Sequence, residues 1–381
     1  MNQQDSIPVY LDYNATTPVL PEVVDAMLPY LREHFGNPSS NHAYGYKTRD
    51  SVVEARAQVA GLLGCRPEEI YFTSGGTEAN NLAIRGVVAT RPERRHVVTS
   101  VIEHPATEMP CKLLQEHGLD VSWLAVDETG MVSTADLVAA LRPDTALVTV
   151  MHANSETGTL QPIPELTAAA HKHGAMMHTD AAQTTGKILY QVDELGVDLL
   201  SIVGHKMYAP KGIGALYVRN GTPLEPQLLG GGHEQGLRSG TENVPYIIGL
   251  GQACVIARDS AQQEALRISQ LRDQLWGDLH AAIPGLALNG HPELRLPNTL
   301  NVRFPGVSGN AILANAPAIA AATGSACHAE DESASAVIRA MGLSEAEALG
   351  SVRLTLGRGT TAEEITMASR SLVRAFKIVI S

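Results

Sequence analysis

The chain is poor in cysteine. Only four of its 381 residues are cysteine, and no two of them form a Cys-x-x-Cys pair. So few and so widely spaced thiols argue against a disulfide framework and against a zinc site. We therefore expect no metal site, and we expect the chain to work in a reducing cytoplasm.

Basic residues and long apolar runs are also scarce. The chain has 28 Lys and Arg residues and 40 Asp and Glu residues, which gives a formal net charge of −12. Such a chain offers no basic patch for a nucleic acid or an anionic membrane. The longest apolar stretch, residues 312–322, falls short of the roughly 20 residues of a membrane span and is broken by Asn315 and Pro317. No basic start followed by an apolar segment marks a signal peptide.

Apolar residues make up 44% of the chain, which is enough to form sizeable hydrophobic cores. Short β-branched runs alternate with amphipathic segments. The expected strands are residues 70–73, 96–100, 122–124, 146–151, 176–179, 199–203 and 215–218, and the expected helices include residues 51–63, 79–89, 106–117, 134–141 and 163–173. This alternation predicts an α/β fold with a mainly parallel sheet between helices.

The composition changes after Pro245. A long helical pattern at residues 246–279 follows, and short strands return at residues 300–304. We predict a large domain over residues 15–260. A smaller α+β domain is then formed by residues 1–14 and 261–381.

A glycine turn follows the first expected strand of the sheet. In Thr73-Ser-Gly-Gly-Thr-Glu78 a strand ends, two glycines turn, and a helix begins at Thr77. Free N–H groups and the positive end of the helix dipole make such a turn an anion site suited to a phosphate. The same residues also suit a plain glycine turn with a Thr cap.

Two further strand ends carry ionisable side chains. Asp180, in His178-Thr-Asp-Ala-Ala-Gln183, either holds a cationic ring nitrogen or caps the next helix. Lys206 follows a strand and Gly204. A lysine that is partly desolvated in such a place becomes a usable amine for Schiff-base formation, whereas most loop lysines are merely solvated.

Taken together, these features match the needs of one cofactor. A phosphate cradle, an acid for a pyridinium nitrogen and a Schiff-base lysine are what pyridoxal 5′-phosphate requires. All three lie where expected strands end, and open α/β sheets place ligands there. His104 also follows a strand, and its imidazole could stack on the pyridine ring. The sequence therefore predicts pyridoxal 5′-phosphate as cofactor.

The chain resembles the cysteine desulfurases, which are fold-type I pyridoxal-phosphate enzymes of the class V aminotransferase group. The resemblance spans about residues 9–366, and the stretch from Cys327 to Arg339 is similar to the long-loop (group I) members. The motifs that carry it are Leu11-Asp-Tyr-Asn-Ala-Thr-Thr-Pro18, Phe35-Gly-Asn-Pro-Ser-Ser40, Thr73-Ser-Gly-Gly-Thr-Glu78, His178-Thr-Asp-Ala-Ala-Gln183, Gly204-His-Lys206, Arg238-Ser-Gly-Thr-Glu-Asn243 and Gly324-Ser-Ala-Cys327.

The resemblance implies conversion of L-cysteine to L-alanine, with the sulfur passing to Cys327 as a persulfide. An acceptor protein, such as an iron–sulfur scaffold or a tRNA-thiolation carrier, would then take the sulfur. In this scheme Lys206 holds the cofactor as a Schiff base and removes the α-proton. His104 stacks on the ring and relays a proton.

The resemblance also assigns the remaining site residues. Asp180 would face the pyridine nitrogen and Gln183 the ring hydroxyl. The phosphate would be bound by Gly76, Thr77 and His205, and by Thr241 from the other subunit of a homodimer. Arg353 would clamp the substrate carboxylate as a bidentate fork, with Asn14 and Asn154 as further substrate contacts.

Cys327 also stands apart by its surroundings. It lies among small residues and is followed by the acidic, Ser/Ala-rich stretch of residues 329–334, which suits a thiol that must enter a site and leave again. A cysteine that acts as a small buried hydrophobe is the commoner case. That interpretation fits Cys65, Cys111 and Cys254, which lie in helical patterns.

Some positions depart from the family pattern and leave two alternatives open. Ser155 stands where an asparagine is usual, and Val203 stands where many members have a phosphate-binding serine. Ile202-Val-Gly-His-Lys206 and Gly324-Ser-Ala-Cys-His328 are similar to selenocysteine lyases, which release selenium from L-selenocysteine. A non-catalytic scaffold homologue would be expected to lose Lys206 or Asp180, and both are retained.

Overall fold

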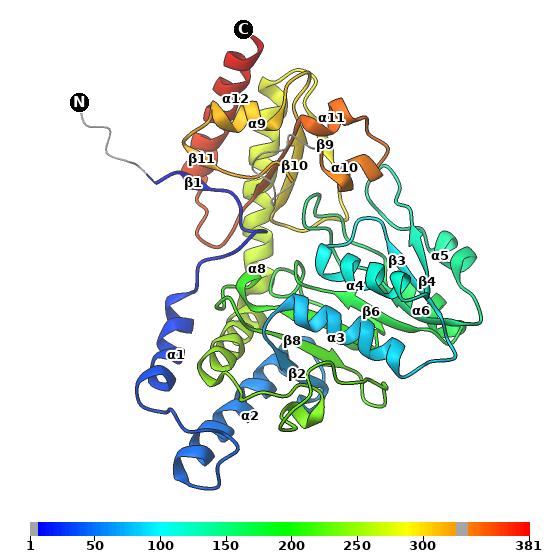
Figure 1. The fold of residues 1–381 in the computed structure, drawn as a ribbon. Helices are drawn as coiled ribbons and strands as arrows, with labels where there is room; N and C mark the ends of the chain where they lie inside the picture. The colour runs from blue at the N-terminus through cyan, green and yellow to red at the C-terminus, as the bar shows by residue number, and fades with distance from the viewer. Residues whose placement is uncertain (1–6, 325–333) are drawn as a thin grey trace.

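A seven-stranded sheet forms the centre of the larger part of the molecule (Figure 1). The structure is a computed structural model and describes residues 7–324 and 334–381. The strand order is β2-β8-β7-β6-β5-β3-β4. The strands are β2 (Ile70–Thr73), β3 (His96–Ser100), β4 (Asp120–Leu124), β5 (Thr145–Thr149), β6 (Met176–Asp180), β7 (Leu199–Val203) and β8 (Gly214–Val218). Only β8 runs antiparallel to its neighbours, so the predicted mainly parallel sheet is confirmed.

Both faces of this sheet are covered by helices. Alternate strand residues enter different cores, so that Val97 packs with one cluster and Val98 with the other. This double burial explains why the strands are nearly continuous apolar runs in the sequence. Helices α3 (Gly76–Ala89) and α4 (Pro105–Glu116) cover one face; the other is covered by α1 (Pro21–Arg32), α2 (Ala43–Leu63), α5 (Thr134–Ala140), α6 (Ile163–Lys172), α7 (Val192–Leu195) and the first half of α8 (Val244–Ala282).

Local signals set the helix ends close to where the sequence predicts them. Helix α4 begins with Pro105, whose missing N–H costs nothing at the first helical position. Helix α2 ends at Gly64, which adopts a φ of 70°. Cys65 therefore lies outside α2, and the expectation that it sits in a helix is wrong. Its side chain is partly buried against the core.

A second core lies in the C-terminal part together with the first described residues. Strands β9 (Ala287–Asn289), β10 (Thr299–Arg303) and β12 (Ser351–Thr355) form an antiparallel sheet in the order β12-β10-β9, and β1 (Val9–Tyr10) pairs with β11 (Ile319–Ala320). Helices α9 (Gly309–Ala314), α12 (Ala362–Ile380) and the second half of α8 pack on it. The short helices α10 (Ala336–Ala340) and α11 (Glu345–Leu349) form a small separate cluster.

Helix α8 connects the two cores. It is one unbroken helix of 39 residues that runs past both parts (Figure 1). Its residues up to Ala257 belong to the first core, and those from Ile268 belong to the second. The predicted division at residues 260/261 therefore falls inside a continuous helix, and the domain boundary itself stays a prediction.

The helices of the described chain give no sign of a membrane span, since none of them is both long and apolar enough to cross a bilayer.

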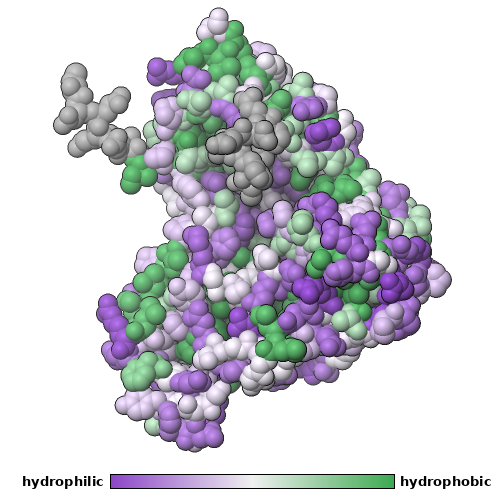
Figure 2. All heavy atoms as spheres, viewed as in Figure 1, coloured by the Kyte–Doolittle hydropathy of each residue, from purple (hydrophilic) through white to green (hydrophobic). Residues whose placement is uncertain are grey.

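Exposed apolar side chains gather around α1 and α2 (Figure 2). They include Val24, Leu31, Phe35, Tyr44 and Val53.

Candidate active site

The glycine turn after β2 forms an open cradle of backbone N–H groups. Gly75 has a φ of 149°, which a residue with a side chain rarely adopts, and it caps α3 without a side-chain hydrogen bond. The first N–H groups of α3 therefore lack intrahelical partners. A Cβ at Gly76 would lie 2.5 Å from Cγ2 of Val203. The cradle thus offers the backbone N–H groups of Gly76 and Thr77 to a ligand. Beside it, the apolar side chain of Val203 stands where a serine would offer a hydroxyl group.

An ion pair holds this cradle in place. Glu78, in the first turn of α3, accepts the Ser74 N–H at 2.8 Å and the Arg238 Nε–H at 2.8 Å. The contact ties the segment that carries Thr241 to the turn. Thr241 is exposed and shares a pocket of about 140 Å³ with Thr73 and Ser74 of the same chain. A contribution of Thr241 to a second subunit is not tested by this geometry and stays a prediction.

Two candidate site residues lie in the single 3₁₀ turn that follows β7. His205 Nδ1 lies 3.2 Å from Thr16 Oγ1, and burial lowers the pKa of His205 to about 4, so its imidazole is neutral near pH 7. Lys206 Nζ donates to the backbone oxygen of Asn14 at 2.6 Å. Burial first, and then the positive charge of Arg353, lower the pKa of Lys206 to about 8. A much larger share of this amine is unprotonated near neutral pH than of an ordinary lysine.

Asp180 ends β6 as a buried carboxylate with one strong partner. Its Oδ2 accepts Asn80 Nδ2 at 2.7 Å, and its Oδ1 accepts the Ala182 N–H at 2.9 Å. The second bond holds the turn that follows β6, and no helix begins there, so the expectation that Asp180 caps a helix is wrong. Its contact with a ring nitrogen stays a prediction. Asn80 lies 100 residues away on α3, and nothing in the sequence links it to Asp180.

His104 caps α4 and is locked in one tautomer by that cap. Its Nδ1 accepts the Ala106 N–H at 3.0 Å. Burial lowers the pKa of His104, so the neutral ring carries its proton on Nε2. The structure therefore makes His104 a hydrogen-bond donor at the nitrogen that the cap leaves free.

The neighbouring Glu103 is a buried acid that sequence reasoning missed. Its Oε1 accepts Ser100 Oγ–H at 2.5 Å and the Met151 N–H at 3.0 Å, while its Oε2 has no partner among the described residues. Burial raises the pKa of Glu103 to about 8. Glu103 therefore stays protonated near pH 7 and adds no charge beside Asp180.

We expect the stability of the Glu103→Gln variant to depend less on pH than that of the wild type. The folded state holds a proton on Glu103 up to about pH 8, whereas the unfolded chain releases it near its ordinary pKa of 4.5. The wild type therefore loses stability as the pH rises between these values, by up to about 5 kcal/mol from this residue, and glutamine removes that loss. Urea unfolding at about pH 5.5, 7 and 8.5 measures it.

Glu116→Gln, at the exposed end of α4, is the matched control and should follow the wild type at every pH. Parallel pH dependences of the Glu103→Gln variant and the wild type would show that Glu103 is ionised in the folded protein.

Asn14 joins several of these groups. Its backbone oxygen accepts Gln183 Nε2 at 3.1 Å as well as Lys206 Nζ. Its side chain donates to Ser155 O at 3.0 Å and to Thr299 Oγ1 at 2.9 Å. The predicted substrate residue Asn14 therefore lies at the centre of the site, but its amide nitrogen is already engaged.

Arg353, on β12, lies close by and is almost fully buried. One of its terminal nitrogens pairs with Asp12 Oδ1 at 2.8 Å and the other donates to Ser155 O at 3.2 Å. Its Nε has no acceptor within the described ranges. A buried guanidinium with a donor to spare suits a carboxylate ligand.

Asn154 has a different setting. Its Oδ1 accepts the N–H groups of Glu156 and Thr157, and its Nδ2 donates to Ile102 O at 3.2 Å. All these bonds fix the turn that presents Ser155 O. The structure thus gives Asn154 a role in shaping the loop, and its substrate contact stays a prediction.

Glu156 follows in the same turn and contacts residues on both sides of the undescribed segment 325–333. Its Oε2 accepts Ser335 Oγ–H at 2.5 Å, and a Cβ at Gly324 would lie 2.5 Å from the same oxygen. Burial raises the pKa of Glu156 to about 7.

The four cysteines separate into two groups. Cys327 lies outside the described residues. Cys111 and Cys254 are buried, and burial raises the pKa of both thiols as well as that of Cys65. Thiols with raised pKa values form little thiolate, which makes these three poor nucleophiles.

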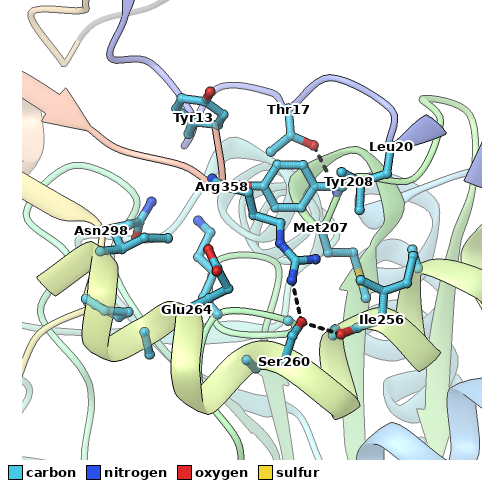
Figure 3. Close-up of a pocket in the computed structure, with 18 of the residues that line it drawn as sticks. Tyr13, Thr17, Leu20, Met207, Tyr208, Ile256, Ser260, Glu264, Asn298 and Arg358 are labelled. Carbon is cyan, nitrogen blue, oxygen red and sulfur yellow. Dashed lines mark hydrogen bonds between the residues drawn. The ribbon is translucent and has the colours of Figure 1, made fainter. Parts of the chain in front are cut away.

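A small pocket lies between Lys187 and the middle of α8. It encloses about 40 Å³ and is lined by Tyr13, Tyr208, Ser260 and Arg358, among others (Figure 3). The Arg358 guanidinium donates to Ser260 Oγ, and the Arg358 N–H donates to Tyr208 at 2.7 Å. Lys206 does not line this pocket. Across the described part of the chain, no group of three His, Cys, Asp or Glu residues is arranged to hold a metal ion.

Comparison with known proteins places this geometry in context. The model of the aminotransferase class-V family matches residues 9–367. A cysteine desulfurase (IscS) of Dictyoglomus turgidum is 46% identical over 94% of this chain and 91% of that protein. Among solved structures, a NifS-like protein is 36% identical with a TM-score of 0.91, over 98% of this chain and all of that one. A structure described as SspA in complex with cysteine is 38% identical, with a TM-score of 0.81 over 91% of this chain and 98% of that one.

Proposed function

Because the chain belongs to the aminotransferase class-V family, we propose that it is a pyridoxal-phosphate-dependent cysteine desulfurase. It converts L-cysteine to L-alanine and takes the sulfur onto Cys327 as a persulfide. One observation carries this proposal: Lys206 with its lowered pKa, the buried Asp180 and the open N-terminus of α3 each follow or end a strand of the same sheet. The 46% identity to a cysteine desulfurase over nearly the whole chain supports the same reaction.

The residues of the site fit pyridoxal 5′-phosphate. The glycine cradle at Gly75 and Gly76 has no room for a larger residue at Gly76 and leaves N–H groups for a phosphate, which Thr77 and the neutral His205 would also contact. Asp180 offers a carboxylate to a ring nitrogen, and Lys206 offers an amine for the Schiff base. The bound cofactor supplies an electron sink for the pair that is left when a proton leaves the substrate's α-carbon.

The chain's own residues perform the binding and the proton movements. Arg353 binds the substrate carboxylate through its fork. Lys206, whose amine is partly unprotonated near pH 7, removes the α-proton. Asp180, whose carboxylate is oriented by the hydrogen bond from Asn80, would contact the ring nitrogen. His104 donates from Nε2, since its Nδ1 is held by the cap of α4.

Cys327 carries the sulfur. Its thiolate attacks the γ-sulfur of the substrate, an S–S bond forms, and the Cβ–S bond of the substrate breaks. The electron pair of that bond stays on the substrate carbon, which takes up a proton to give alanine. The sum is L-cysteine plus the Cys327 thiol going to L-alanine plus the Cys327 persulfide, with no external oxidant or reductant.

We also propose a cytoplasmic homodimer that passes its sulfur to an acceptor protein. The exposed apolar side chains around α1 and α2, with Leu229 at 83% exposure, favour a covered surface there. The exposed position of Thr241 is compatible with a contact to the cofactor phosphate of a second subunit. An iron–sulfur scaffold or a thiolation carrier fits as acceptor, and a reducing compartment keeps the Cys327 thiol available.

The test compares L-cysteine and L-selenocysteine as substrates of the purified protein. We expect a yellow, pyridoxal-phosphate-loaded protein that forms alanine from L-cysteine and carries an additional sulfur on the peptide containing Cys327, as measured by amino-acid analysis and mass spectrometry. Alanine from L-selenocysteine with almost none from L-cysteine would favour the selenocysteine lyase, which the names of the relatives support less. A colourless protein that forms no alanine would favour the scaffold homologue.

A further inference from the structure

A second lysine lies inside the site, and neither the motifs nor the mechanism above uses it. Lys187 follows Gln183 by four residues in the segment after β6. Its Nζ donates to Gln183 Oε1 at 2.7 Å and to Asn14 Oδ1 at 2.8 Å. Burial first, and then the charge of Lys206, hold the pKa of Lys187 well below its ordinary value. Placing an amine here carries a desolvation cost, although both of its acceptors are neutral amides.

The partners of Lys187 decide which way the Gln183 amide faces. Lys187 Nζ donates here, so the atom of Gln183 that faces it is the amide oxygen. The opposite edge of the Gln183 amide meets the backbone oxygen of Asn14, which only accepts. Both contacts therefore require the same orientation. The NH2 edge is directed toward Asn14 O, the same oxygen that accepts Lys206 Nζ.

Asn14 is held by the same rule. Its amide nitrogen faces the carbonyl oxygen of Ser155, so its amide oxygen faces Lys187. Asn298 Nδ2 donates to this oxygen as well, at 3.0 Å. Lys187 thus donates to the oxygen ends of both amides, while their NH2 ends donate to carbonyl oxygens on the far side.

We propose that Lys187 is a positioning residue that fixes the Gln183 amide with its NH2 edge toward the ring oxygen of the cofactor. The inference rests on the proposed function, because it takes Gln183 as the residue that reaches that oxygen. A donor at this place stabilises the deprotonated ring oxygen. An amide turned the other way would place an acceptor against it and would oppose its negative charge.

The test replaces Lys187 by methionine, which keeps a stem of similar length without a donor. In the variant loaded with pyridoxal 5′-phosphate, the midpoint of the pH titration of cofactor absorbance should rise by about one pH unit, because Gln183 no longer holds one orientation. Cofactor binding to the apoprotein, measured by equilibrium titration, should weaken about tenfold. Lys172→Met, at the exposed end of α6, is the control and should change neither value.

A double variant separates this role from a merely structural one. If Lys187 acts through Gln183, then Lys187→Met should shift the titration midpoint little further once Gln183→Ala is present. Full additivity of the two shifts would overturn the proposal. If the methionine variant does not fold, Lys187→Gln takes its place, since its amide is one bond shorter and does not span both acceptors; an upward shift is again expected.

The outcomes distinguish this inference from the proposed function. Wild-type protein that binds no pyridoxal 5′-phosphate would contradict the proposed function. Wild-type protein that binds it with the same titration midpoint as both Lys187 variants would overturn the role of Lys187 alone.

Discussion

Replacing Lys206 by alanine is expected to reduce alanine formation from L-cysteine by at least about a thousandfold. Lys206 has two tasks in the proposed reaction, since it holds the cofactor and moves the α-proton, and loss of a positioned acid–base group alone costs about 100- to 10,000-fold. Burial and Arg353 give it a pKa of about 8, a property that no exposed lysine of the chain can replace. Steady-state alanine production, with added pyridoxal 5′-phosphate, measures the effect.

Lys172→Ala is the matched control for this variant. Lys172 lies exposed in the last turn of α6, so its removal should leave the rate unchanged. The variant Lys206→Ala should still unfold at nearly the wild-type temperature in the absence of cofactor, because among the described residues its amine donates a single hydrogen bond, to Asn14 O. Activity above about a tenth of the wild-type rate would refute the assignment of Lys206.

The variant Cys327→Ala should lose alanine formation from L-cysteine by about a thousandfold or more, because no other thiol can take the sulfur. The three remaining cysteines are held in environments that raise the pKa of their thiols. Cofactor absorbance and its change on adding L-cysteine should persist, since Lys206, Asp180 and Arg353 remain. Single-turnover mixing and steady-state alanine analysis separate these two steps.

Cys65→Ala serves as the control, because Cys65 lies outside the site and its thiol has a pKa of about 12. A rate for Cys327→Ala close to the wild type with L-cysteine would remove the persulfide from the mechanism. Alanine formation retained only with L-selenocysteine would show that selenium can leave the substrate without the Cys327 thiol.

The positions of the glycine turn, of Asp180 and of Lys206 could be predicted from the sequence because their signals are local. A strand, two glycines and a helix start are read from neighbouring residues, and the structure begins α3 at Gly76, one residue before the expected Thr77. The same holds for Asp180 at the end of β6 and for Lys206 just after β7. Each of these residues is placed by the end of the strand that precedes it.

The supporting residues could not be predicted in this way. Glu103 was passed over because an acidic residue next to a histidine carries no local sign of burial, and its raised pKa comes from desolvation in the folded protein. The turn that Asn154 holds through its amide oxygen is likewise visible only in the folded chain. Cys65 lies directly after α2, because Gly64 ends that helix.

The sequence by itself determined the fold class, the cofactor and the strand ends at which the candidate site residues lie, since strand burial, turn chemistry and helix starts depend on a few neighbouring residues. Only the tertiary structure decided which hydrogen-bond partners these residues have and how far their pKa values are shifted. Asn80 reaches Asp180 across 100 residues, and Lys187 reaches Asn14 across 173. Such pairs depend on strand order and on the packing of distant segments, and the pKa values of Lys206 and Glu103 depend on how much water that packing removes.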